Sequence, residues 1–300
     1  MPEANPYPHA LVLCADSLDQ YVLQRVVDRL AASGARAAEP VWLSKGRAVD
    51  LPLMSMPEQP ETLLAELDAD LQATDMALVE QAKRRKKLLV SDMDSTIIQD
   101  ETIDLLAAEL GLGEQVAAIT ARAMHGEIDF RSALLERVGL LRGLSEHALG
   151  GLPAAATLTP GAKALVKTMR AHGAHTVLVS GGFDFMAEAI APIVGFHETR
   201  ANVLSVANGA LTGDVVGDIV DADTKLSVLR ARQAELGLGR EQVLAIGDGA
   251  NDLNMIEAAG MGVAFHAKPI VEQRAGYRIR YTDLRTALYF QGYRDSEIQD

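Results

Sequence analysis

The clearest pattern in the chain is a set of continuous apolar runs, each followed by small polar or acidic residues. The runs cover residues 88–91, 176–179 and 243–246, and stretches with helical periodicity lie between them. Apolar runs of this length, without alternation, are typical of strands buried on both faces of a parallel sheet. Strands that alternate with helices in this way predict an α/β fold with a doubly wound, Rossmann-like parallel sheet.

The residues that follow these predicted strands carry the candidate chemistry. Asp92 and Asp94 follow the first run, Ser180 the second, and Asp248 the third. We expect these side chains to meet, because the carboxyl ends of parallel strands share one edge of the sheet, where ligands bind. Carboxylates gathered at one point repel each other unless a cation lies among them, and such oxygen ligands suit Mg²⁺. The sequence therefore favours a magnesium-centred acidic site; the alternative is a set of aspartate-rich turns that close the strands.

Residues 1–84 carry a separate pattern, which predicts a small α+β domain ahead of a core formed by residues 85–300. Its predicted elements are a strand, a helix, two strands and a helix, over residues 9–15, 19–32, 37–44, 46–53 and 60–83. This order resembles a shortened or degenerate ACT-type domain, a module that often binds amino acids. Because nothing here looks like a ligand-binding loop, dimerisation or scaffolding is favoured over regulation. The basic run over residues 83–87 contains no aromatic residues and is interpreted as a solvated linker.

Residues 100 to about 155 interrupt the alternation with helices alone. Three helices are predicted over residues 102–110, 114–124 and 130–141, with glycine stops at Gly111, Gly126 and Gly143. In the third helix, Arg137 lies on the border of an apolar face made of Leu134, Leu135, Val138 and Leu141. We expect a helical cap over the site, which controls when water enters and supplies substrate contacts.

Local residue patterns predict the rest of the core. Thr159 is expected to cap a helix that begins at Pro160. Ser180-Gly181-Gly182 is expected to open another helix, whose N-terminus would bind an anion, with a plain helix cap as the alternative. Lys225 lies in the first turn of a helix, where the dipole disfavours a cation; it is either a site residue or a solvent-exposed lysine. The remaining elements predicted are a hairpin over 202–220 with turns at 208–209 and 213–214, strands over 262–265 and 277–281, a helix from Leu284, and a frayed tail over 295–300. His266 and Lys268 are expected at the edge of the site, without an assigned role.

Composition narrows the class of protein. A chain of 300 residues with 48% hydrophobic content suits a well-cored globular protein. Its net charge of −13 disfavours nucleic-acid binding and means that local cations must attract any anionic substrate. The single Cys14 excludes a disulfide framework, and no apolar stretch is long enough for a membrane span or a signal peptide. We expect a cytoplasmic protein without a membrane or nucleic-acid partner.

Four motifs in order are similar to those of the haloacid dehalogenase-like phosphatases. They are the D-x-D-x-T pattern from Asp92 to Thr96, then Ser180, Lys225 and the segment 247–252. More narrowly, residues 92–137 resemble the phosphoserine phosphatase family, whose pattern is present in Glu101-Thr102-Ile103-Asp104, Ala123-Met124-His125-Gly126, Asp129-Phe130 and Glu136-Arg137-Val138. The resemblance covers about residues 85–290 and leaves the first 84 residues outside it.

This resemblance implies Mg²⁺-dependent hydrolysis of a phosphate monoester, O-phospho-L-serine, to L-serine and phosphate, the last step of serine biosynthesis. Asp92 would be the nucleophile that forms an aspartyl-phosphate, and Asp94 the general acid and base. The metal ligands would be Asp92, the backbone carbonyl of Asp94, and Asp248. Asp252 would be a further ligand or, like Thr96, a residue that orients the ligands. The phosphoryl group would be held by Ser180, Gly181, Lys225 and Asn251, unless Asn251 orders Lys225 instead.

The same resemblance gives the cap its substrate contacts. Arg137 would bind the substrate carboxylate, although Arg131 and Arg142 compete for this role and a packed surface arginine is the alternative. Glu101 would meet the substrate ammonium, unless it is a surface glutamate. Met124 and Phe130 would form apolar walls of the pocket, or else belong to the core of the cap.

Other functions fit part of the pattern. The chain could act on another small phosphomonoester or transfer phosphate to a second alcohol. An amino-acid-sensing regulator with a residual phosphatase body is a second alternative, and it would bind serine at the N-terminal domain. A nuclease or a structural metal-binding protein would explain the acids but not Lys225 and the serine-glycine loop. The expected partners are a small substrate and a second copy of the chain, bound through the N-terminal domain.

Overall fold

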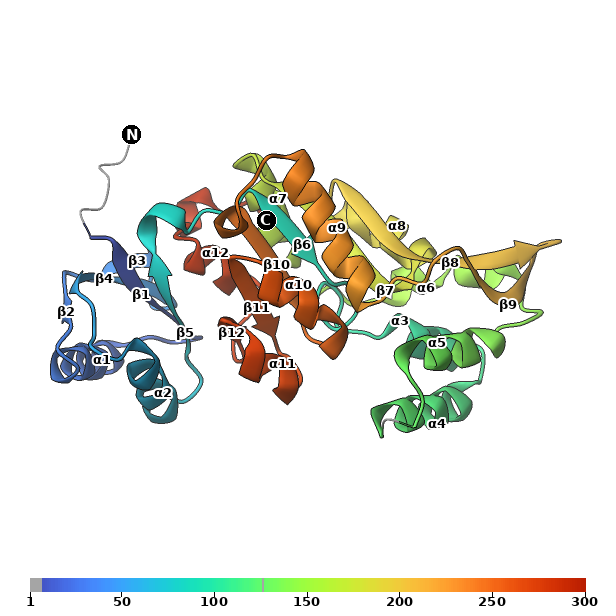
Figure 1. The fold of residues 1–300 in the computed structure, drawn as a ribbon, viewed down its shortest axis with the longest axis horizontal. Helices are drawn as coiled ribbons and strands as arrows, with labels where there is room; N and C mark the ends of the chain where they lie inside the picture. The colour runs from blue at the N-terminus through green and yellow to red at the C-terminus, as the bar shows by residue number, and fades with distance from the viewer. Residues whose placement is uncertain (1–6, 126) are drawn as a thin grey trace.

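The protein, described here by a computed structural model over residues 7–125 and 127–300, is built on two β-sheets that follow one another along the chain (Figure 1). The first sheet lies at one end of an elongated molecule, and the second forms its centre. The helices of the cap lie near the other end, beside the hairpin of β8 and β9. No helix in the described part of the chain is long and apolar enough to cross a membrane.

The central sheet has seven strands in the order β12-β11-β10-β6-β7-β8-β9, parallel except for β9. Its strands are β6 (Leu88–Ser91), β7 (His175–Phe183), β8 (Glu198–Ala207), β9 (Ala210–Val216), β10 (Val243–Gly247), β11 (Met261–Phe265) and β12 (Tyr277–Ile279). The helices that follow its strands are α7 (Ala162–Ala171), α8 (Asp184–Val194), α9 (Ala222–Glu235), α10 (Leu253–Ala258), α11 (Pro269–Arg274) and α12 (Thr286–Phe290). The predicted doubly wound α/β fold is confirmed.

Alternate residues of β6 face two separate cores, which explains the continuous apolar run. Leu89 packs in the core that contains residues of α7 and α8. Leu88 and Val90 pack in a second core with Leu229 of α9 and Met255 of α10. Because both faces of the strand are covered by helices, a polar residue becomes tolerable only where the strand leaves the sheet. The polar residues after β6 therefore lie at the edge of the sheet where the candidate site is expected.

The N-terminal sheet has the order β2-β4-β1-β5, with β3 also paired to β4, and all its pairings are antiparallel. Its elements are β1 (His9–Cys14), α1 (Gln20–Ala32), β2 (Arg36–Ala37), β3 (Val41–Ser44), β4 (Ala48–Ser55), α2 (Pro60–Asp70) and β5 (Asp75–Glu80). Cys14 is a buried core residue, as predicted. The domain boundary placed after residue 84 stays a prediction.

The predicted helix over residues 60–83 is wrong in its second half. Helix α2 ends at Asp70, Ala73 adopts a left-handed φ of 54°, and β5 then pairs with β1. Side chains of β5 alternate between buried and half-buried, a period of two that a short mixed segment does not reveal clearly. The domain therefore has five strands where the sequence predicted three, because β5 is added and the predicted strand over 37–44 is divided into β2 and β3.

The basic run over residues 83–87 is not a solvated linker. Arg84 is buried and forms a bidentate ion pair with Asp50, at 2.6 and 2.9 Å. The same guanidinium donates to the backbone carbonyls of Tyr289 and Phe290 in α12. Lys86 is also buried, and its ammonium donates to the carbonyl of Glu241. The run therefore anchors the N-terminal sheet to the core, because a buried cation must be paired with acceptors that only the folded chain brings together.

The cap consists of helices alone, as predicted, and its elements are α3 (Thr102–Glu109), α4 (Gly113–Met124), α5 (Phe130–Gly139) and α6 (Leu152–Ala155). Gly111 and Gly143 adopt positive φ at helix ends, while the third predicted stop, Gly126, lies outside the described residues. Leu135 is wrong as a core position: it is exposed, whereas Leu134, Val138 and Leu141 are buried. Backbone hydrogen bonds from residues 143–146 to the hairpin of β8 and β9 hold the cap on the core.

Three further predictions differ in detail. The hairpin turns at Asn208-Gly209, as expected, but residues 213–214 lie within β9. Helix α7 begins after Gly161, and Thr159 gives it no side-chain cap. The tail over residues 295–300 is held in place, because Lys167 and Arg285 both bind Asp300. Short 3₁₀ turns are present at Gln81–Lys83, Glu146–Leu149, Arg240–Gln242, Ala250–Asp252 and Asp295–Glu297.

Candidate active site

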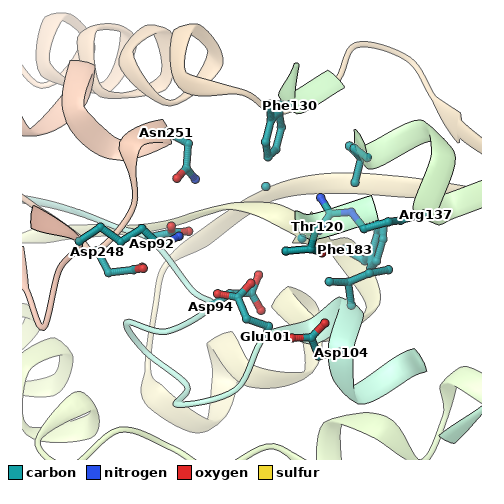
Figure 2. A pocket seen from close by; sticks show the side chains of 15 residues that line it. Asp92, Asp94, Glu101, Asp104, Thr120, Phe130, Arg137, Phe183, Asp248 and Asn251 are labelled. Atoms are coloured by element: carbon teal, nitrogen blue, oxygen red, sulfur yellow. The ribbon is translucent and has the colours of Figure 1, made fainter. Parts of the chain in front are cut away.

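A tight turn after β6 places two aspartates at the edge of the sheet. The amide of Asp92 still bonds to the carbonyl of Ile246 in β10, at 3.0 Å, so this residue continues the sheet pairing. The carbonyl of Met93 then accepts from the amides of residues 96, 97 and 98, and Ser95 adopts a left-handed φ of 54°. This turn reverses the chain so that Asp92 and Asp94 both face the same cavity (Figure 2).

Lys225 lies between two buried carboxylates. Its Nζ is 2.7 Å from Oδ1 of Asp92 and 2.7 Å from Oδ1 of Asp252, and no part of the lysine side chain is exposed. Burial alone would lower the pKa of Lys225, but Asp252 and Asp92 raise it above its ordinary value. Burial and the neighbouring Asp252 carboxylate raise the pKa of Asp92, while Lys225 opposes them. In the first turn of α9, Lys225 is thus a site residue and not a solvent-exposed lysine.

Among the contacts of the described residues, those to the Asp92 carboxylate hold one of its two oxygens. Oδ1 accepts from the amide of Met93, at 2.7 Å, in addition to its contact with Lys225. Among the described residues, no hydrogen bond or ion pair reaches Oδ2. The donors thus fix the carboxylate and leave Oδ2 available for a ligand or an electrophile.

Asp92, Asp248 and Asp252 form a cluster whose ligand atoms lie within 4.8 Å of one another. Asp252 has both oxygens occupied, by Lys225 and by the amide of Gly249, at 3.0 Å. Asp248 is more available, since Thr96 donates to its Oδ1 at a longer 3.3 Å. Contacts of this kind orient neighbouring groups, and the roles of Thr96 and Asp252 toward a metal stay predictions.

The cluster fits a hard divalent cation. Burial, followed by the charges of Asp252 and Glu101, raises the pKa of Asp248 to about 7, with Lys268 and Lys225 opposing the rise. Oxygen ligands of this type, gathered at one point, are the donors that Mg²⁺ prefers. The backbone approaches closely here, because a Cβ on Gly247 would lie 2.4 Å from Cγ of Asp252. Glycine is therefore required for the packing of this acid.

Asp94 is held by donors on both sides. Its Oδ1 accepts from the amide of Thr102, at 2.9 Å, and from the Thr102 hydroxyl. Its Oδ2 accepts from the Ser180 hydroxyl, at 3.1 Å. Burial raises the pKa of Asp94 to about 6, although the hydrogen bonds from Thr102 lower it. These bonds fix the carboxylate beside Asp92, where it can exchange a proton with a bound group.

The serine-glycine loop does not begin a helix, which corrects the prediction. Strand β7 continues to Phe183, and α8 begins at Asp184. Ser180 accepts a hydrogen bond from the amide of Gly182, at 2.8 Å, within this irregular strand end. A Cβ on Gly182 would lie 2.5 Å from Oδ2 of Asp94, so only glycine leaves room for this carboxylate. The loop thus holds Asp94 with the Ser180 hydroxyl, and Gly182 leaves the space that the carboxylate occupies.

A cavity of about 330 Å³ lies between the core and the cap. Figure 2 shows Asp92, Asp248 and Asn251 on one side of it and Thr120 and Arg137 on the other. Phe130 of the cap lies against the core, since its ring would lie 3.1 Å from a Cβ on Gly181. The lining residues are Asp92, Asp94, Glu101, Ile103, Asp104, Thr120, Phe130, Leu134, Arg137, Gly181, Gly182, Phe183, Asp248, Asn251 and Lys268. Ser180 and Lys225 lie buried behind this wall.

Of the three competing arginines, Arg137 is the one that lines the cavity. It is half-buried on the border of α5, as predicted, and its Nε donates to the carbonyl of Ala133 at 3.2 Å. Arg142 instead faces Asp214 of the hairpin, at 3.5 Å, and Arg131 is exposed. Glu101 also lines the cavity and accepts from the hydroxyl of Ser95, at 2.8 Å. The side chain of Met124 lies outside the described residues.

Sequence reasoning missed several residues of the site. Thr102, which binds Asp94 twice, lies inside a segment noted for its family pattern, but nothing in its spacing indicated a bond to the acid. Asp104 and Thr120 face the cavity from α3 and α4, and Phe183 from the end of β7. Lys268, which the sequence places at the edge of the site without an assigned role, is a lining residue of the cavity.

The chain is similar to known proteins over most of its length. The family model of the haloacid dehalogenase-like hydrolases matches residues 89–257. A phosphoserine phosphatase of Streptomyces coelicolor is 38% identical over 278 residues, which cover 91% of this chain and 68% of the relative. One of Streptococcus thermophilus is 49% identical over 199 residues, covering 66% of this chain and 93% of the relative. The solved structure of a probable phosphoserine phosphatase from Vibrio cholerae, in its unliganded form, superposes with a TM-score of 0.77 at 31% identity, over 97% of this chain and 88% of that one. The chain therefore belongs to the haloacid dehalogenase-like hydrolases and, among them, to the phosphoserine phosphatases.

Proposed function

We propose that this enzyme hydrolyses O-phospho-L-serine to L-serine and phosphate through an aspartyl-phosphate on Asp92, as the last step of serine biosynthesis. One observation carries the proposal: a single cavity has the acids for phosphoryl transfer at one end and Arg137 at the other. A phosphorylated amino acid has matching groups at its two ends, a phosphate and a carboxylate. Glu101, on the same wall, would pair with the ammonium group.

The proposed metal is Mg²⁺, held by Asp92, the backbone carbonyl of Asp94, and Asp248. When bound, it supplies positive charge that neutralises the acids and the transferring phosphoryl group. Asp252 has both of its oxygens occupied by the protein, which supports a role in orienting Lys225 and the 248–252 loop and not in direct ligation.

The chain's own residues divide the reaction into two steps. In the first, Oδ2 of Asp92 forms a bond to phosphorus while the bond from phosphorus to the serine oxygen breaks. The departing oxygen is a strong base, and Asp94 gives it a proton. In the second step, Asp94 takes a proton from water, whose oxygen attacks phosphorus and frees Asp92. Lys225 holds Asp92 in place throughout and offsets its charge.

The phosphoryl oxygens need donors at the end of β7 and in the 248–252 loop. We assign this role to Ser180, the backbone of Gly181, and Asn251. The Ser180 hydroxyl donates to Asp94 in the present structure, so it would turn to the phosphoryl group when substrate enters. Phe130 would close the apolar side of the pocket over Gly181.

The purified protein is expected to release phosphate from O-phospho-L-serine in the presence of Mg²⁺, and to lose this activity after treatment with a chelator. Added Mg²⁺ should restore it, and Ca²⁺ should not, because the transfer needs a small cation with tight geometry. Phosphate release from phosphoserine, phosphothreonine and a sugar phosphate measures the preference. A sugar phosphate turned over faster than phosphoserine would instead support the alternative, a phosphatase or phosphotransferase for another small ester.

Arg137→Ala is expected to lower kcat/KM for O-phospho-L-serine by about 30-fold or more, since a charged hydrogen bond contributes about 2 kcal/mol. O-phosphoethanolamine, which lacks the carboxylate, should lose less than about threefold. Arg142→Ala is the matched control on the same cap, because Arg142 faces Asp214 and should leave both substrates unchanged. Equal losses on the two substrates would place the carboxylate contact elsewhere.

Two statements about the whole protein stay predictions. A reducing, cytoplasmic location is supported by Cys14, a buried free thiol, as the single cysteine. Association of two copies through the N-terminal sheet can be measured by analytical ultracentrifugation.

A further inference from the structure

The loop after β11 reaches into the active site from the side of the N-terminal sheet. The amide of Lys268 donates to the backbone carbonyl of Asp248, at 3.0 Å, and the lysine side chain lines the cavity. Lys268 is exposed, whereas Lys225 is buried behind Asp92. Lys268 is therefore the lysine that an incoming anion meets at the phosphoryl end, among the lining residues of the described chain.

The charge of this cavity explains why such a cation matters. Five carboxylates line it, from Asp92, Asp94, Glu101, Asp104 and Asp248, and the whole chain carries a net charge of −13. A phosphate dianion approaching these acids is repelled unless positive charge is close by. Lys268 stands on the loop that touches Asp248, while Arg137 lies at the opposite, cap end.

His266 gives the loop its direction and adopts an unfavourable backbone conformation. Its φ is +42°, a region that non-glycine residues adopt only when their surroundings hold them there. Two hydrogen bonds do so: its amide donates to the carbonyl of Ile279, at 2.8 Å, and its Nε2 donates to the carbonyl of Thr282, at 2.9 Å. The position of Lys268 thus depends on the segment 280–282, between β12 and α12.

A buried carboxylate of the N-terminal sheet holds that segment, and Asp68 of α2 also pairs with its Arg280 side chain. Asp75, at the start of β5, is 1% exposed and accepts four hydrogen bonds from the segment. Its Oδ1 accepts from the amide of Arg280, at 2.7 Å. Its Oδ2 accepts from the amides of Tyr281 and Thr282, at 3.2 and 2.9 Å, and from the Thr282 hydroxyl, at 2.6 Å. A continuous series of hydrogen bonds therefore leads from Asp75 through Thr282 and His266 to the Lys268 loop.

We infer that Lys268 assists binding of the phosphorylated substrate, and that Asp75 of the N-terminal sheet is a positioning residue that holds Lys268 in place. The N-terminal domain then helps to build the active site by holding the Lys268 loop, in addition to any role in the association of two copies of the chain. This inference rests on the proposed phosphatase function, and it assigns the N-terminal domain an effect on substrate affinity that acts through Lys268.

Lys268→Gln should raise KM for O-phospho-L-serine about fivefold at low ionic strength, as expected for one unit charge lost near a dianion in water. The difference should shrink at about 0.5 M salt, where screening removes exposed interactions, and kcat should stay within about twofold. Lys268→Arg should restore the KM. An unchanged KM for Lys268→Gln at low salt would overturn the inference.

Asp75→Asn tests the positioning step through a double-mutant cycle. Alone, it should raise KM about threefold at low salt, because the amide cannot accept all four hydrogen bonds. In the Lys268→Gln background it should add nothing, since the residue that it positions has lost its charge. An equal rise in both backgrounds would refute the positioning role. If Asp75→Asn does not fold, His266→Ala replaces it in the same cycle, because it removes the ring that binds Thr282.

Asp50→Asn is the matched control. Asp50 is a buried acid of the same N-terminal sheet, but its partner Arg84 leads to α12 and not to the 266–268 loop. It should lower the melting temperature and leave KM unchanged; a KM rise as large as that of Asp75→Asn would show general loosening and count against the inference. Failure of the wild-type enzyme to hydrolyse phosphoserine would reject the proposed function itself, and the variants are compared only once that activity is measured.

Discussion

Asp92→Asn is expected to lower kcat by about 10⁴-fold or more, as for other residues that act as the nucleophile. Asparagine keeps the size and the bond from Met93, but its amide cannot form the aspartyl-phosphate. The fold should survive, because Lys225 keeps its ion pair with Asp252, at 2.7 Å. Removing Lys225 instead would leave two buried carboxylates facing each other without compensation, so that change would confuse catalysis with stability.

The measurement that identifies the nucleophile is covalent labelling. Wild-type enzyme mixed with ³²P-labelled O-phospho-L-serine and quenched in acid should retain label on the peptide that contains Asp92. Asp92→Asn should retain none, and its melting temperature should stay close to that of the wild type. Asp100→Asn is a useful control on the same loop: Asp100 binds the amide of Thr157 and is not a lining residue of the cavity. Label on the Asp92→Asn protein would assign the nucleophile to another acid.

The central fold could be predicted because its determinants are local and redundant. Each buried strand is apolar on both faces, as Leu89 and its neighbours Leu88 and Val90 show by packing into two different cores. Helices follow these strands with standard stops, such as Gly195 with its positive φ at the end of α8. Burial on both faces also limits where polar residues can stand, so the acids at strand ends indicated the edge that carries the site.

The N-terminal region was harder because its structure depends on distant partners. Nothing near Arg84 in the sequence shows that Asp50 and two carbonyls of α12, 205 and 206 residues away, will surround it. A basic run is usually solvated, and only the folded chain makes burial of this one favourable. Strand β5 was missed for a related reason: its pairing with β1 decides its conformation, and its own alternation is weak.

The sequence predicted which residues form the site better than it predicted the contacts among them. Asp92, Asp94, Lys225 and Asp248 converge as expected, since each follows a strand or opens a helix at the same edge. The position of Ser180 was expected at a helix start, but β7 extends past it. Lys268 could not be assigned, because its approach to Asp248 depends on the left-handed conformation of His266, which no sequence pattern reports.

Asp94→Asn is expected to lower kcat for O-phospho-L-serine by about 10²- to 10⁴-fold, the usual contribution of a general acid or base. The substitution fits the local contacts, since the amide oxygen can accept from Thr102 and the amide nitrogen can donate to Ser180. Substrate binding should therefore change little. Metal binding should also be kept, because the proposed ligand from this residue is its backbone carbonyl.

Pre-steady-state kinetics separates the two proton transfers assigned to Asp94. p-Nitrophenolate leaves phosphorus without needing a proton, so Asp94→Asn should still release one equivalent of it rapidly and then turn over slowly, because the second step lacks its base. With O-phospho-L-serine the same variant should show no rapid phase, because the serine oxygen needs the proton that asparagine cannot give. A rapid phase with both substrates would remove Asp94 from the first step, whereas none with either would mean that the variant has lost the geometry of Asp92. The comparison thus assigns Asp94 to each step by the leaving group, independently of how far the overall rate falls.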